Sequence, residues 1–162
     1  MANCAPVKAS TSVPSLYRLV LTTLEPLAAT GGVLQTLTNP ESYLQIMTRS
    51  RVPYDPATHF LYTELAGSWL LFVFLVAFAL RHFDDLRVWR WVCLAVLLQD
   101  ALYMWSVAEA VGGWGVWVDV KGWQASDWLV LWTTLPGFLV RVLIVLGIGV
   151  NEERRGVGAK RG

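Results

Sequence analysis

The stretch LAGSWLLFVFLVAFAL, residues 65–80, contains no charged side chain and places apolar residues on every face of a helix. With the four residues before it, the run reaches about 20 residues, which is the length that crosses the hydrocarbon core of a bilayer. It ends abruptly at the polar segment RHFDD, residues 81–85. This stretch therefore predicts an integral membrane protein.

The composition of the whole chain agrees with a location in a membrane. Of the 162 residues, 55% are hydrophobic and 15% are charged, whereas a soluble domain carries about 25% charged residues. The formal net charge of +1 offers no strongly basic surface for nucleic acid, and the spacing of Cys and His matches no zinc site. We expect membrane lipids as partners, and no nucleic acid, metal or cofactor.

Further apolar segments predict an all-α fold, namely a four-helix transmembrane bundle formed by one domain (residues 17–150). The expected spans are residues 17–37, 59–80, 89–110 and 128–150, between a polar N-terminal tail (1–16) and a basic, polar C-terminal tail (151–162). The first span is the most interrupted by polar residues and glycines. Because proline cannot donate the helical hydrogen bond, kinks are expected at Pro26 and Pro136.

The positively charged residues orient the expected bundle. An even number of spans places both termini and the middle loop on one side of the membrane. That side carries nine Lys and Arg residues, and the opposite side carries three. The nine are Lys8, Arg18, Arg81, Arg87, Arg90, Arg154, Arg155, Lys160 and Arg161; the three are Arg49, Arg51 and Lys121. Since cytoplasmic loops are enriched in Lys and Arg, both termini are expected in the cytosol.

Ionisable residues at mid-depth predict a buried ionic cluster of Glu25, Asp100 and Arg141, with Gln99 nearby. Each of the three lies about nine or ten residues from the inner end of its span, so their depths agree within roughly one helical turn. An ionisable group at the bilayer centre costs about 2.5–3.5 kcal/mol on insertion scales and usually faces the bundle interior with a partner. Small residues near Glu25 and Arg141 would let the helices pack closely.

Two interpretations of this cluster are open. The three residues can form a packing clamp that fixes the register of the helices. Alternatively they form a polar pocket in an apolar bundle, in which two carboxylates protonate and deprotonate a lipophilic substrate. In that case Glu25 and Asp100 are the candidate catalytic acid and base, and Arg141 is their charge partner. Passage of protons or ions is a third interpretation, which the small size of the chain disfavours.

Four short motifs in combination resemble a family of small fungal four-span membrane proteins, catalogued chiefly as a domain of unknown function. The motifs are Leu24-Glu25-Pro26-Leu27, Pro40-Glu41-Ser42-Tyr43-Leu44, Gln99-Asp100-Ala101-Leu102-Tyr103, and Trp123-x3-Asp127-Trp128 leading to Arg141 and Gly147. Some members are encoded beside genes of secondary-metabolite pathways, including terpenoid and polyketide ones. The resemblance thus implies a role in such a pathway at the endoplasmic reticulum membrane, and it supplies no established catalytic residues.

Together, the residues and the resemblance lead us to expect a multi-pass membrane protein of fungal secondary-metabolite biosynthesis. Its expected activity is that of an acid/base isomerase or cyclase on a lipophilic small molecule, with membrane-bound pathway enzymes as candidate partners. Two alternatives stay open: a non-enzymatic membrane scaffold for pathway enzymes, and a small transporter subunit. The sequence leaves open whether the protein is an enzyme at all.

Overall fold

The computed structural model describes residues 7–151, and within that range every regular element is a helix. In chain order the elements are α1 (Ala9–Ser12), α2 (Ser15–Leu19), the π-helical turn η1 (Val20–Leu24), α3 (Glu25–Thr38), α4 (Pro40–Thr48), the 3-10 turn η2 (Pro56–Thr58), α5 (His59–Val73), the π-helical segment η3 (Phe74–Ala79), α6 (Leu80–His82), α7 (Leu86–Ala110), α8 (Trp114–Trp117), the 3-10 turn η4 (Val120–Gly122) and α9 (Ala125–Leu146). The expected all-α class is confirmed.

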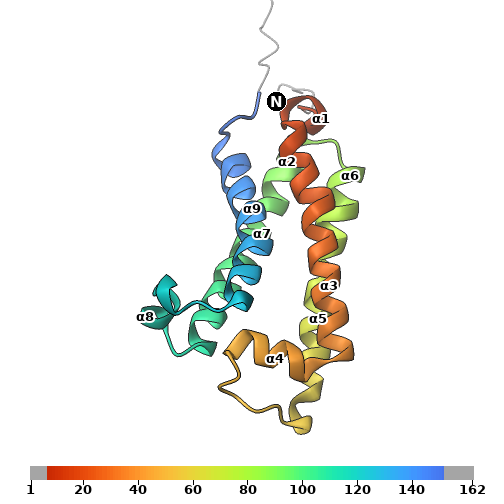
Figure 1. Cartoon of the computed structure of the whole chain (residues 1–162). Coiled ribbons are helices and arrows are strands. Elements are labelled where there is room, and N and C mark those ends of the chain that lie inside the picture. The colour runs from red at the N-terminus through yellow and green to blue at the C-terminus, as the bar shows by residue number, and fades with distance from the viewer. Residues whose placement is uncertain (1–6, 152–162) are drawn as a thin grey trace, which may run out of the picture.

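Consecutive elements join into long helical rods that run along one another (Figure 1). The rod α2–η1–α3 packs along α5 and η3, and α7 packs along α9. The short helix α4 crosses the end of the bundle that lies away from the N-terminus, and it contacts α3, α7 and α9. We call this end the α4 end, and the opposite one the terminal end.

Among residues 7–151, three helices are long and apolar enough to cross a membrane: Pro56–His82, Leu86–Ala110 and Ala125–Leu146. Large apolar side chains such as Phe74, Leu102 and Leu129 are more than half exposed on these helices. An apolar surface of this extent suits contact with lipid rather than water. The structure is therefore consistent with an integral membrane protein.

The first expected span, residues 17–37, is not among those three helices. The chain is helical throughout Ser15–Thr38, so its length is sufficient. Arg18, Glu25 and Gln35 lie within it, however, together with several threonines, and these polar residues lower its mean hydropathy. The structure thus provides three membrane-length apolar helices rather than the expected four.

The last span ends earlier than expected. Helix α9 stops at Leu146 because Gly147 adopts a left-handed conformation with φ of 73°, which is the usual conformation just after a helix end. The expected boundary at residue 150 therefore lies four residues beyond the observed one.

Residues 7–14, which were expected to belong to a polar tail, pack against the terminal end of the bundle. The Leu86 N–H donates to the Val7 carbonyl at 2.9 Å, and the Asn151 N–H donates to the Ser12 carbonyl at 2.9 Å. The N–H and hydroxyl of Ser10 both donate to Asp84, and these bonds lower the pKa of that carboxyl. The expected C-terminal tail lies outside the described residues except for Asn151.

A kink was expected at Pro26, and the π-helical turn η1 ends two residues before this proline. Proline lacks an N–H, and its ring crowds the carbonyl four residues earlier, which is that of Thr22. Arg81 Nη2 donates to this carbonyl at 2.6 Å and to the Thr23 hydroxyl at 2.9 Å. A side chain from α6 thus replaces the hydrogen bond that proline removes. Pro136, in contrast, lies inside α9, which continues through it.

The buried apolar side chains form two clusters at different heights of the bundle. The larger includes Leu21, Val76, Leu80, Val96 and Ile144. The smaller consists of Val107, Ala108, Val111 and Trp117. On α7, Asp100 lies between the residues of the two clusters, so the polar part of the interior occupies the level that separates them.

A candidate functional site lined by two carboxylates

Three charged side chains from three helices meet in the bundle interior. Arg141 of α9 donates through Nη1 to Glu25 Oε2 at 2.6 Å, and through Nη2 and Nε to Asp100 Oδ2 at 2.6 and 3.0 Å. Arg141 is 1% exposed, and Glu25 and Asp100 are each 8% exposed. The predicted ionic cluster is therefore present, while a catalytic role for its members stays a prediction.

Gly137 makes room for this cluster. It lies one helical turn before Arg141, on the same face of α9. A Cβ atom at this position would overlap the Glu25 carboxylate. Because glycine has no side chain, the carboxylate lies against the backbone of α9 and reaches the guanidinium. The Phe72 ring, whose centroid is 5.8 Å from Arg141 Cζ, adds a cation–π contact.

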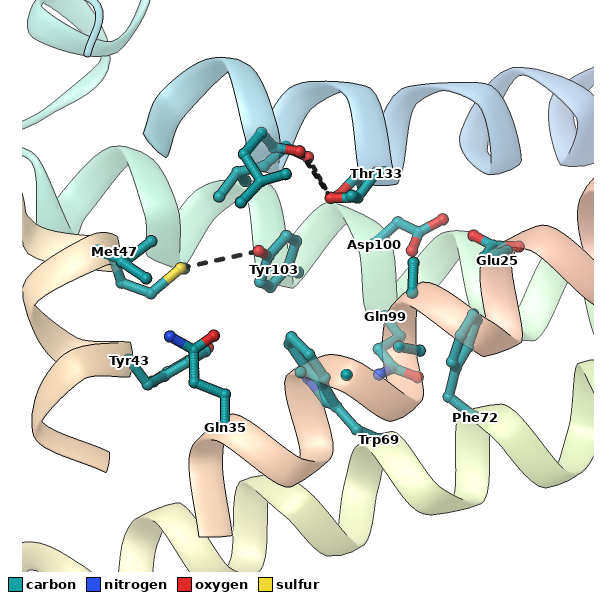
Figure 2. Close-up of a pocket in the computed structure, with 18 residues that line it drawn as sticks. Glu25, Gln35, Tyr43, Met47, Trp69, Phe72, Gln99, Asp100, Tyr103 and Thr133 are labelled. Atoms are coloured by element: carbon teal, nitrogen blue, oxygen red, sulfur yellow. Dashed lines mark hydrogen bonds between the residues drawn. The ribbon is translucent and has the colours of Figure 1, made fainter. Parts of the chain in front are cut away.

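A cavity of about 320 Å³ opens beside the two carboxylates. Its lining comes from five helices and contains apolar, aromatic and polar side chains. The lining residues are Glu25, Ala28, Ala29, Gly31, Gly32, Gln35, Tyr43, Ile46, Met47, Trp69, Phe72, Gln99, Asp100, Tyr103, Leu129, Val130, Thr133 and Thr134. Arg141 is absent from this lining, so it supports the carboxylates from behind. Figure 2 shows Glu25 and Asp100 at one end of the cavity and Tyr43 and Met47 at the other.

Aromatic rings form much of the cavity wall. The Trp69 ring makes edge contacts with Tyr43 and Tyr103, at centroid distances of 6.0 and 6.2 Å. Trp69 lies directly over Gly32 of α3, where a Cβ atom would overlap its ring. Burial raises the pKa of the Tyr43 hydroxyl on α4, so this group stays protonated and can donate a hydrogen bond.

Helix α4 closes the cavity at its tyrosine end and is held there by a buried ion pair. Arg49, which follows the last residue of α4, places Nε 3.0–3.1 Å from the two carboxylate oxygens of Asp127. Asp127 also accepts from the Gln124 N–H at 2.6 Å, within the box that caps the start of α9. The side chains of Arg49 and Asp127 are 7% and 3% exposed. The same carboxylate thus caps α9 and fixes α4.

Sequence reasoning found the charged end of the site and missed its aromatic wall. Gln99, expected near the cluster, does line the cavity. Tyr43 and Tyr103 belong to the motifs of the family resemblance, which assigns no role to either residue. Trp69 had no distinguishing signal, because its span is apolar on every face. The tryptophans near α8, such as Trp117, Trp123 and Trp128, pack on one another and do not line this cavity.

The fold and the site together define a class, that of all-α proteins with membrane-length helices around a carboxylate-lined cavity. Residues 10–151 match the family described as Domain of unknown function (DUF7704), so the chain belongs to this family. No curated protein and no solved structure matches the chain. Among residues 7–151, no group of three or more His, Cys, Asp and Glu side chains is arranged to hold a metal ion.

Proposed function

We propose that this protein binds a lipophilic small molecule within the membrane and isomerises or cyclises it by acid/base chemistry. The observation that supports this proposal is the arrangement of two carboxylates at one end of a largely apolar and aromatic cavity. Arg141 occupies Glu25 Oε2 and Asp100 Oδ2. The second oxygen of each carboxylate accepts no hydrogen bond from the part of the chain that the structure describes.

The proposed step moves protons and needs no redox partner. One carboxyl group, in its acid form, gives its proton to a carbon of a double bond, and a C–H bond forms there. The other, ionised, removes a proton from a second carbon of the substrate, and a C–H bond breaks there. The substrate keeps its composition while the double bond moves or a ring closes, and a proton returns between the carboxyl groups before the next turnover. Arg141 is then a positioning residue, because it does not reach the cavity.

We also propose that the rod α2–η1–α3 is a fourth span and that both termini face the cytosol. This rod packs along α5 and exposes Leu24, Leu27 and Leu34. The two ends of the described chain lie at the same end of the bundle, as an even number of spans requires. The setting in fungal secondary metabolism, at the endoplasmic reticulum and beside membrane-bound pathway enzymes, is supported by the motif resemblance alone.

The test is deletion of the gene followed by metabolite profiling and complementation. We expect an intermediate to accumulate in the deletion strain and wild-type protein to restore the product. Asp100→Asn and Glu25→Gln, at unchanged protein level, should each fail to restore it. Glu64→Gln is the matched control, because Glu64 is exposed and outside the cavity, and it should restore the product fully.

Other outcomes of this experiment would contradict the proposal. Normal product from both Asp100→Asn and Glu25→Gln would exclude acid/base catalysis at this site. Retention of finished product inside the cells of the deletion strain would indicate a transporter subunit. A uniform fall of all pathway compounds, without an accumulating intermediate, would indicate a scaffold.

A further inference from the structure

We infer that the cavity selects a molecule with a positive charge at the end that reaches Glu25 and Asp100, so that its ligand is a lipophilic amine or another cationic amphiphile. This inference rests on the binding site of the proposed function and goes further by assigning the charge of the ligand. It follows from three observations: the charge of the cavity wall, the free oxygens of the two acids, and the aromatic rings beside them.

The cavity wall is acidic. Its lining contains Glu25 and Asp100 and no Lys, Arg or His. Behind it, one guanidinium pairs with both carboxylates, so the cluster is neutral while one acid is protonated, as at the start of the proposed step, and carries a net charge of −1 when both acids are ionised. Because the protein interior has a low dielectric constant, water stabilises this excess negative charge poorly. A cation brought by the ligand would neutralise it.

The two acids that line the cavity retain acceptor capacity. Arg141 takes one oxygen of each, and Glu25 Oε1 and Asp100 Oδ1 receive no hydrogen bond from residues 7–151. Both side chains are about nine-tenths buried, so solvent reaches them little outside the cavity. Figure 2 shows the two carboxylates side by side at the same end of the cavity. A cationic head group placed there would lie against two carboxylates that share a single guanidinium.

Aromatic rings flank this position and extend away from it. Phe72 and Trp69 line the cavity on the side of α5, and Tyr103 lines it on α7. Ring faces attract cations within about 6 Å, more strongly when water is excluded. The volume of about 320 Å³ lies at the lower end of the range for small-molecule sites. The cavity therefore suits a compact cationic head with a short apolar body.

The experiment uses the full chain in nanodiscs of uncharged phosphatidylcholine, with empty nanodiscs subtracted. The probe is radiolabelled 4-phenylbutyl-trimethylammonium, and the competitor is its uncharged carbon isostere, (5,5-dimethylhexyl)benzene. We expect saturable binding of the cation, and displacement by unlabelled cation at concentrations about tenfold or more below those of the isostere. Asp100→Asn and Glu25→Gln should weaken binding by about tenfold or more, and Glu64→Gln should leave it unchanged.

Equal displacement by the cation and by the isostere would overturn the inference, and that comparison needs no variant to fold. Unchanged binding in both Asp100→Asn and Glu25→Gln would overturn it as well. The two proposals fail separately. A preference for the cation, without any effect of these variants on metabolites, would leave this inference standing and remove the proposed catalysis. If restoration of the product depends on both acids but the cation and the isostere bind equally well, the proposed catalysis stands and this inference fails.

Discussion

A single glycine decides whether Glu25 can reach its partner. Gly137 is the position where the Glu25 carboxylate touches the α9 backbone, and any side chain there would occupy the same space. An isolated helix would favour alanine over glycine by about 1 kcal/mol. The glycine is therefore explained by the tertiary contact and not by helix propensity.

Replacing this glycine with alanine should destabilise the protein and disturb the cluster. We expect Gly137→Ala to cost about 1–3 kcal/mol, because overpacking forces the carboxylate or the helix to shift. Thermal unfolding in nanodiscs measures the cost. Gly67→Ala is the control, since a Cβ atom at Gly67 meets nothing within 4 Å. Equal unfolding temperatures for the two variants would show that the close approach at Gly137 does not constrain the bundle.

The elements of this protein differ in how far the sequence predicts them. The three membrane-length helices follow from long apolar runs, because a helix in lipid must satisfy its backbone groups internally. The turn η1 and the packing of α1 leave no such pattern. The sequence predicts that Arg81 is a charge at a membrane boundary. In the structure it donates to the Thr22 carbonyl and so completes the backbone hydrogen bonding of the rod α2–η1–α3. Such a role depends on a neighbour 59 residues away in the chain.

The link between Arg81 and the proline-containing rod can be tested. Arg81→Ala should lower the free energy of unfolding by about 1 kcal/mol, because the Thr22 carbonyl loses its donor. Arg87→Ala is the control, since no hydrogen bond of the Arg87 side chain is seen among residues 7–151. Chemical unfolding in detergent micelles measures both.

A second variant makes this test specific. In a Pro26→Ala background the new N–H can donate to the Thr22 carbonyl, so Arg81→Ala should cost less there than in the natural protein. Equal costs of Arg81→Ala in the two backgrounds would mean that Arg81 does not compensate for the proline.

The number of helices that cross the membrane is a property of the whole molecule. Three are long and apolar enough among residues 7–151, and the proposal adds the rod Ser15–Thr38. Its polar residues have partners in the bundle: Glu25 pairs with Arg141, and the hydroxyls of Thr22 and Thr36 donate to carbonyls of the same helix. Pairing of this kind reduces the cost of placing polar groups in lipid.

Cysteine labelling in sealed microsomes, with the cytosolic face outward, tests the fourth span. The reagent is a membrane-impermeant maleimide, and each chain carries one cysteine in a Cys93→Ala background. The first chain keeps Cys4, and the chains with Phe83→Cys or Val52→Cys also carry Cys4→Ser. We expect Cys4 and Phe83→Cys to react without detergent. Val52→Cys should react only after detergent is added. Labelling of Phe83→Cys with protection of both Cys4 and Val52→Cys would instead indicate three spans.

The sequence by itself determined the helical class, the three helices that are long and apolar enough to cross a membrane, and the three residues of the ionic cluster. Long uncharged runs have few stable solutions other than helices in lipid, and charges at equal depth in such runs have few partners other than one another. Only the tertiary structure decided that Arg141 stands behind the acids, that Gly137 admits Glu25, and that Trp69, Tyr43 and Tyr103 build the cavity wall. These features depend on which faces of five separate helices meet, and a helix that is apolar all round does not encode its inward face.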